Sequence, residues 1–191
     1  MTPAHGAIVL AAGASTRLGY AKQLIEIDGE PLLRRATRCA LATQPLDCVV
    51  VLAHEARPIA SALEGIDVRT LRIEDSGAGM SASLRAGIAA LDARCAGALV
   101  VVTDQPALLP EHLLALCASW RAAPARAAAS AYAGIVGVPA LLPRAWFDDI
   151  GRLTGDTGAR ALLRARDTDV IAVPAPELAR DLDAPEDAPG D

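Results

Sequence analysis

The residue types best suited to phosphate chemistry gather near the start of the chain, in the loop Gly13–Lys22. Its glycines let the backbone approach a ligand closely, and exposed N–H groups in such a loop form a concavity that binds anions. The planar guanidinium of Arg17 suits phosphate oxygens, and Lys22 adds a compact point charge. The apolar run before the loop, Ala7–Ala12, is typical of a buried strand. We therefore predict a polyphosphate-binding loop at the end of a strand.

Lys22 is the only lysine in the chain, because every other basic residue is an arginine. A lysine inside this glycine-rich loop indicates that an ammonium group is required there, the alternative being that one surface lysine falls there by chance. The loop lacks the middle glycine of G-x-G-x-x-G, and Lys22 is followed by Gln23 where a P-loop has Ser or Thr. The spacing thus matches neither motif and disfavours a nicotinamide-dependent oxidoreductase.

A carboxylate forms the second candidate site. Asp104 directly follows the hydrophobic run 98–103 and precedes Gln105 and Pro106. In open α/β sheets, ligands bind beyond the carboxyl ends of the strands, and a carboxylate there can hold Mg²⁺ against phosphates. The alternative is that Asp104 caps the turn before Pro106. The position favours a metal ligand.

Two further acidic residues, Asp181 and Asp183, lie near the end of the chain. Because they are two apart, they would face the same side of a strand and could complete a metal site with Asp104. Alternatively, Asp183 and Glu186 have the spacing of a helix capping box. We expect Asp183 to be the second metal ligand, with Asp181 as the other candidate.

Hydrophobic periodicity and turn signals predict the elements that position these residues. Strands are expected over 7–12, 48–53, 68–73, 98–103, 127–133 and 169–173, and helices over 31–43, 56–63, 110–121 and 158–166. Another helix is expected where Ser81 caps or begins it, with the stripe Met80, Leu84, Ile88 and Leu91 in the core. The alternation of strands and helices predicts one doubly wound, three-layer α/β domain over 1–191 with a mostly parallel sheet.

Composition narrows the classes of protein. Apolar residues are 52% of the 191 and aromatics 3%, which suits helices of Ala, Val, Leu and Ile on a parallel sheet. The net charge of −5 argues against a nucleic-acid partner, and no apolar run approaches the ~18 residues of a membrane span. The four cysteines lie in apolar segments without C-x-x-C pairs, so we expect them buried and reduced, in a cytoplasmic protein. The N-terminus lacks the basic region of a signal peptide.

The opening loop, from Leu10 to Lys22, matches the pattern L-A-A-G-x-S-x-R-x-G-x-x-K. This pattern resembles the signature of the MobA-like nucleotidyltransferase family. The segments 79–84, 104–106, 155–163 and 181–187 resemble the G-M-S-x-S-L, D-Q-P, G-D-x-G-A-R-x-L-L and D-I-D-T-P-E-D segments of the molybdenum cofactor cytidylyltransferase branch. In the last segment Ala184 replaces the Thr. The resemblance covers Ile8 to Asp187.

The resemblance implies Mg²⁺-dependent transfer of CMP from CTP to the phosphate of molybdopterin, with release of pyrophosphate. It implies that Arg17 and Lys22 are catalytic and that Asp104 and Asp183 hold the metal. Its nucleotide-binding residues would be Leu10, Ala11, Ala12, Gly13, Ser15, Gly79 and Ser81. Members that use GTP tend to have L-A-G-G where this chain has Leu10-Ala-Ala-Gly13, which favours CTP over another nucleoside triphosphate.

The acceptor end departs from the family pattern. Val138 stands where the branch typically has the His of G-H-P, next to Pro139. The resemblance assigns Val138, Pro139 and Arg160 to the acceptor, although Arg160 could instead pair only with Asp156. The departure keeps a sugar or polyol phosphate open as the acceptor. The partner implied is a molybdenum hydroxylase or its maturation chaperone. The chain could itself be a non-catalytic maturation partner, a reading that the intact candidate catalytic and metal-binding residues disfavour.

Overall fold

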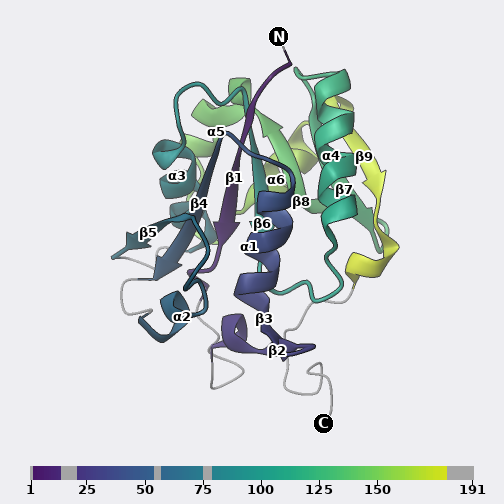
Figure 1. Ribbon diagram of the computed structural model, residues 1–191. Helices are drawn as coiled ribbons and strands as arrows, with labels where there is room; N and C mark the ends of the chain where they lie inside the picture. The colour runs from purple at the N-terminus through teal and green to yellow at the C-terminus, as the bar shows by residue number, and fades with distance from the viewer. Residues whose placement is uncertain (1, 14–20, 54–56, 75–78, 180–191) are drawn as a thin grey trace.

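A seven-stranded sheet forms the centre of the computed structural model, which describes residues 2–13, 21–53, 57–74 and 79–179 (Figure 1). Its strands lie in the order β5-β4-β1-β6-β8-β7-β9. Their bounds are β1 His5–Leu10, β4 Asp47–Ala53, β5 Arg69–Ile73, β6 Gly97–Val102, β7 Ala127–Tyr132, β8 Ile135–Pro143 and β9 Val170–Pro174. Only β8 runs antiparallel to its neighbours among these strands, so the carboxyl ends of the other strands share one edge of the sheet.

Helices cover both faces of the sheet. One face carries α1 Leu32–Ala42, α2 Arg57–Ser61 and α4 Pro110–Ala122, and the other carries α3 Met80–Ala90, α5 Phe147–Gly151 and α6 Ala159–Ala165. The alternation along β1 fills both cores, since Ala7 and Val9 face the α1 side and Ile8 faces the α3 side. The three-layer α/β fold expected from the sequence is therefore confirmed.

Short elements complete the fold. They are the 3₁₀ turns η1 Lys22–Leu24, η3 Arg144–Trp146, η4 Asp167–Asp169 and η5 Pro176–Ala179, and the two-stranded ribbon of β2 Glu26–Ile27 and β3 Glu30–Pro31. Asp28 and Gly29 form the turn that joins the two strands of the ribbon, and they have positive φ angles of 53° and 74°. Pro110 begins α4 as its first residue, where its missing N–H costs nothing.

The segment 134–151 differs most from the sequence-based expectation, which placed no strand or helix there. It forms β8, η3 and α5 instead. Gly137 and Pro139 make β8 hard to predict from the sequence, because both residue types are depleted in strands. The pairing with β7 shows how the strand accommodates them: Ala129 lies opposite Ala140, and Ser130 opposite Gly137, so Val138 and Pro139 bulge out of the ladder.

Several smaller expectations are also settled. β1 begins and ends two residues earlier than the predicted strand 7–12. Met80 was expected in the core, but it is 49% exposed because it begins α3 at the edge of the sheet; Leu84 is fully buried as predicted. All four cysteines are buried and free, as expected.

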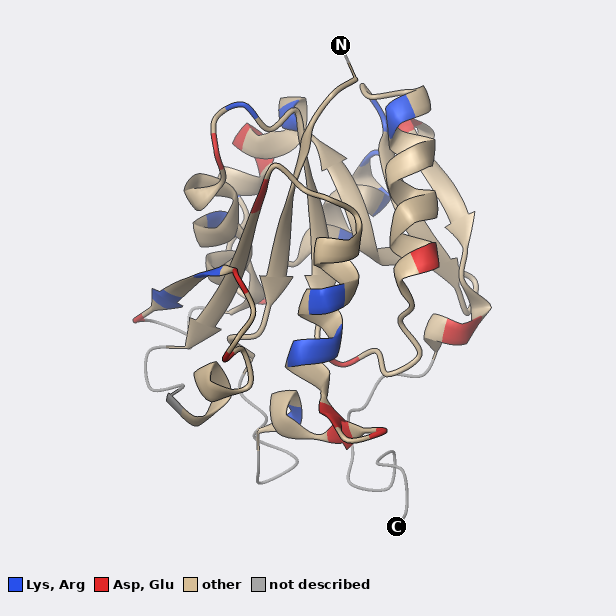
Figure 2. Cartoon of the chain, in the orientation of Figure 1, with Lys and Arg blue, Asp and Glu red and all other residues tan. Residues whose placement is uncertain are grey.

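Charge is distributed around this framework, and the central strands carry none. The strands β1 and β6 contain no Asp, Glu, Lys or Arg, and Figure 2 shows the charged residues on helices, outer strands and loops. Across the described part of the chain, no helix combines the length and the apolarity needed to cross a bilayer. Within the described chain, Lys22 and Asp104 are charged residues that follow β1 and β6 along the sequence.

Stability should fall in mild acid because of His5. This side chain is 1% exposed, and burial, reinforced by Arg121, lowers its pKa to about 4. Below pH 6.5 the His5 side chain therefore binds a proton in the unfolded chain but stays neutral in the folded chain. The free energy of unfolding falls as the pH drops toward 4. We expect the His5 contribution to cost about 2 kcal/mol between pH 7 and pH 5, at about 1.4 kcal/mol per pK unit.

Urea unfolding at the two pH values measures this loss, with His5→Gln as the control. Glutamine can still hydrogen-bond to Thr43 Oγ1, which lies 2.9 Å from His5 Nε2, but it does not titrate. The variant should lose correspondingly less stability on acidification. An equal loss in both proteins would contradict the assignment.

Candidate functional site

A cleft runs along the edge of the sheet where β1 and β6 end, and it consists of two adjoining pockets. The pockets share the lining residues Leu10, Met80, Val102, Asp104 and Asp156. The glycine-side pocket, of about 310 Å³, is completed by Ala12, Gly13, Lys22, Gln23, Gly79, Ser83 and Thr103. The tyrosine-side pocket, of about 240 Å³, is completed by Val100, Gln105, Tyr132, Val138, Gly158, Ala159 and Arg160.

The two candidate charges meet inside this cleft. Lys22 Nζ lies 2.8 Å from Asp104 Oδ2, and the two side chains are 18% and 24% exposed. The lysine comes from η1 and the aspartate from the loop after β6, 82 residues later. Partial burial shields the pair from water, so its attraction is stronger than that of an exposed ion pair. One carboxylate oxygen of Asp104 is therefore engaged by the lysine.

Gln23 holds the backbone after β1 in place. Its buried side-chain amide donates hydrogen bonds from Nε2 to Ala11 O at 3.0 Å and to Gly13 O at 2.9 Å. Two backbone carbonyls are thereby turned inward toward one donor group. The sequence does not single out Gln23, although a glutamine beside the unique lysine of a glycine-rich loop was a usable signal.

The start of α3 forms part of the glycine-side pocket, which Gly79, Met80 and Ser83 line. Gly79 precedes the helix with φ +85°, and the first turn contains no acidic residue. A helix start of this kind favours an anion. Ser81 lies within the first turn and does not cap the helix; its N–H donates to Gly155 O at 3.2 Å. Its buried Oγ has no hydrogen-bond partner within the described residues.

The α3 start packs tightly against the loop at 155–156. A Cβ on Gly79 would lie 2.4 Å from the carbonyl carbon and oxygen of Gly155, and 2.7 Å from Asp156 Oδ1. Arg85 adds a hydrogen bond from Nη1 to Leu153 O at 2.9 Å. The loop therefore presents Asp156 to both pockets.

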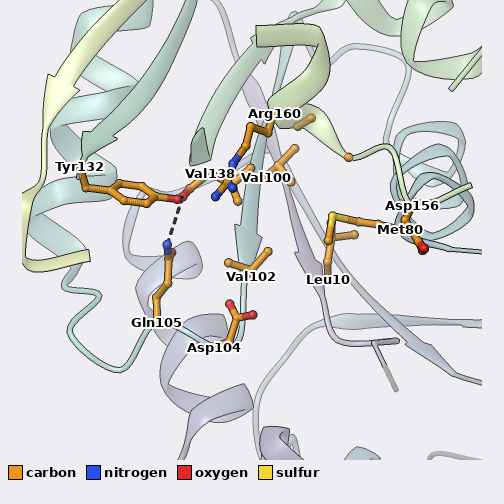
Figure 3. A pocket seen from close by; sticks show the side chains of 12 residues that line it. Leu10, Met80, Val100, Val102, Asp104, Gln105, Tyr132, Val138, Asp156 and Arg160 are labelled. Atoms are coloured by element: carbon orange, nitrogen blue, oxygen red, sulfur yellow. Dashed lines mark hydrogen bonds between the residues drawn. The ribbon is translucent and has the colours of Figure 1, made fainter. Parts of the chain in front are cut away.

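A carbonyl clamp forms the wall of the tyrosine-side pocket. The bulge in β8 directs Val138 O toward two donors, Tyr132 Oη at 3.0 Å and Gln105 Nε2 at 3.2 Å (Figure 3). Pro139 O accepts from Ser130 Oγ at 2.7 Å. His112 Nε2 lies 2.7 Å from the same hydroxyl, and burial lowers the pKa of His112, which favours the neutral ring. Because the Ser130 hydroxyl donates its hydrogen to Pro139 O, it can only accept from the ring. His112 Nε2 therefore donates to Ser130 Oγ.

Arg160 and Asp156 do not pair within the described chain, although that pairing was one alternative. Arg160 is exposed on α6, lines the tyrosine-side pocket, and places its Nε 3.5 Å from where a Cβ on Gly137 would lie. The sequence does not single out Tyr132 or Gln105 as site residues. Gln105 stands in the D-Q-P motif, and Tyr132 is one of only two tyrosines in the chain.

The predicted site residues can be placed as follows. Leu10, Ala12, Gly13, Lys22, Gly79, Asp104, Val138 and Arg160 all line the cleft, whereas Ala11, Ser81 and Pro139 are buried just behind it. Ser15, Arg17, Asp181 and Asp183 lie outside the described residues. No group of three His, Cys, Asp or Glu side chains that could hold a metal occurs in the described ranges.

This fold and cleft define a class of α/β protein that binds ligands beyond the carboxyl ends of parallel strands. Residues 7–170 match the family described as MobA-like NTP transferase domain. The chain therefore belongs to the MobA-like NTP transferase family, a family of nucleotidyltransferases.

Individual relatives agree with this membership. The purine catabolism protein PucB of Bacillus subtilis is 30% identical over 170 residues, which cover 83% of this chain and 80% of PucB. The bifunctional protein GlmU of Sorangium cellulosum is 35% identical over 118 residues, or 58% of this chain. That alignment covers 25% of GlmU, so the chain spans about a quarter of the length of this relative.

A solved structure matches the whole fold. Rv0371c from Mycobacterium tuberculosis H37Rv superposes with a TM-score of 0.80 and 28% identity over 96% of this chain and 95% of that one. The same mycobacterial protein has also been solved in complex with manganese, and that structure is similar at a TM-score of 0.79 and 26% identity.

Gly79→Ala should destabilise the protein by more than its backbone angle explains. The variant combines a strained φ of +85° with contacts of 2.4 Å to Gly155, whereas Gly134, at φ +75°, has open space around its Cβ position. We expect Gly79→Ala to cost about 1–2 kcal/mol more than Gly134→Ala, as measured by urea unfolding. Equal costs would show that the loop at 155–156 yields without penalty.

Proposed function

We propose that this chain transfers a nucleoside monophosphate from a nucleoside triphosphate to a phosphorylated acceptor, with CTP and molybdopterin as its substrates and Mg²⁺ as its metal. The observation that carries the proposal is the Lys22–Asp104 pair, which sits where the two pockets adjoin. One pocket offers glycine backbone and a helix start to phosphates. The other offers a separate compartment for the acceptor.

Asp104 has the chemistry of a ligand for a divalent cation. Carboxylate oxygens are preferred by Mg²⁺, and Asp104 follows β6 at the strand edge with part of its side chain exposed. The manganese complex of Rv0371c supports a divalent metal in this family fold. We propose Asp104 and Asp183 as the residues that hold it. When bound, the metal neutralises charge on the triphosphate.

The reaction is an in-line displacement. An oxygen of the acceptor phosphate forms a bond to the α-phosphorus of CTP, and the bond from that phosphorus to the β-phosphate oxygen breaks, releasing pyrophosphate. The attacking phosphate is already anionic, so no general base is needed. Lys22 would hold the α-phosphate against the acceptor, and Arg17 would stabilise the departing pyrophosphate. Positioning and charge neutralisation supply most of the catalysis in such transfers.

The lining of the tyrosine-side pocket favours an acceptor with an apolar body. Leu10, Val100, Val102 and Val138 form aliphatic walls that can pack against the faces of a ring, and the polar side chains Gln105, Tyr132 and Arg160 line the same pocket. Arg160 on α6 can attract an anionic group at the same pocket. We propose that the modified cofactor passes to a molybdenum hydroxylase or its chaperone in the cytoplasm, where the four free cysteines would stay reduced.

Calorimetric titration of CTP, GTP and ATP, with Mg²⁺ or with EDTA, tests the nucleotide half of this function. We expect metal-dependent binding that favours CTP, followed by pyrophosphate release when molybdopterin is added. Lys22→Ala and Asp104→Ala should each reduce turnover by about 10²-fold or more, the scale for one preorganised electrostatic contact. Near-normal turnover in either variant would remove that residue from the mechanism.

Lys22 should compete with the metal for Asp104 before nucleotide binds. Because Nζ occupies Oδ2 at 2.8 Å, Lys22→Met frees a carboxylate oxygen and should tighten Mn²⁺ binding several-fold without nucleotide, as measured by electron paramagnetic resonance. Asp104→Asn should weaken Mn²⁺ binding strongly. Arg94→Met, which breaks a surface pair with Asp92 on another loop, is the control and should leave Mn²⁺ affinity unchanged. Unchanged affinity in Lys22→Met would show that lysine and metal do not share this oxygen.

A further inference from the structure

In the side-chain amide of Gln105, the nitrogen has a hydrogen-bond partner and the oxygen has none among the described residues. Its Nε2 donates to Val138 O at 3.2 Å. A carbonyl oxygen can only accept, so the nitrogen must face Val138 and Oε1 must point away from it. Oε1 is buried and has no hydrogen-bond partner among the residues that the structure describes. A buried hydrogen-bond acceptor without a partner costs free energy. A donor that reaches this oxygen would recover that cost.

None of the described residues donates a hydrogen bond to this oxygen. The side chain is 5% exposed and lines the tyrosine-side pocket beneath the Tyr132 hydroxyl (Figure 3). The Tyr132 hydroxyl already donates its hydrogen bond to Val138 O. The walls nearby are the aliphatic side chains Val100, Val102 and Leu10. A ligand that enters this pocket can supply the missing hydrogen.

We propose that Gln105 is a specificity-determining residue whose side-chain carbonyl accepts a hydrogen bond from an N–H or O–H of the acceptor molecule. The inference rests on the proposed function, because it takes the tyrosine-side pocket as the acceptor compartment. A buried acceptor atom in an aliphatic wall rejects molecules that leave it unpaired. The pocket thus selects acceptors that combine an apolar body with a hydrogen-bond donor on its edge.

Two variants separate this role from positioning of Val138. Gln105→Met keeps the length of the side chain but removes both the donor to Val138 and the free oxygen. Tyr132→Phe removes the other donor to Val138 and leaves Gln105 intact. Thermal unfolding of both variants establishes that they are folded, and calorimetry with CTP reports on the glycine-side pocket.

The KM for molybdopterin in pyrophosphate release should rise about tenfold in Gln105→Met, the loss expected for one neutral hydrogen bond. It should rise less than about threefold in Tyr132→Phe, and CTP affinity should stay within about twofold in both. Equal KM changes in the two variants would overturn the proposal, because Gln105 would then only position Val138. A parallel loss of CTP affinity would also overturn it.

A direct binding measurement keeps the inference distinct from the proposed function. Pterin is fluorescent and carries ring N–H and amino donors but no phosphate, so its titration into the protein needs no turnover. Binding by the wild type that weakens about tenfold in Gln105→Met supports the proposal even if molybdopterin is not turned over. Equal binding by both proteins, or no binding by the wild type, overturns it.

Discussion

The parallel pairing of β1 with β6 is the constraint on which the candidate site depends. The register places Leu10 opposite Val102, so the chain leaves both strands at the same level and the loops 11–13 and 103–105 emerge side by side. Lys22 and Asp104 can form a 2.8 Å pair only because this register brings their loops together. The uncharged strands behind them, which are buried except at their last residues, fix the register, since a slip would carry apolar side chains to the wrong core.

The antiparallel strand β8 shapes the tyrosine-side pocket through its bulge rather than through a loop at the end of a parallel strand. A regular strand would have hydrogen-bonded Val138 O to β7. The bulge instead turns that carbonyl toward Tyr132 and Gln105, and it ties together β7, β8 and the loop after β6. Bulges often redirect backbone next to active sites. Here the redirected group is a backbone atom, so the clamp does not depend on which side chain stands at position 138.

Much of the fold could be predicted from the sequence, because its signals are local. Buried apolar runs such as 48–53 and helix signals such as Pro110 act within a few residues, and the matching elements β4 and α4 lie where they were expected. The glycine-rich loop and Asp104 could be recognised for the same reason. The pairing of Lys22 with Asp104 could not be predicted from spacing, because it joins residues 82 positions apart. The roles of Gln23 and Gln105 depend on backbone carbonyls that become acceptors only in the folded loops.

The division of the cleft also bears on the valine at position 138, where the family resemblance predicts a histidine. The groups suited to a triphosphate stand on the parallel half of the sheet, in the loops after β1 and β6 and at the start of α3. The tyrosine-side pocket, which we propose for the acceptor, is walled by the β7–β8 hairpin and α6. A valine at 138 removes an imidazole from this wall but leaves the carbonyl clamp and the Gln105 oxygen in place. Under the proposed function, the acceptor would be recognised by the neutral amide of Gln105, whose hydrogen bond does not change with pH.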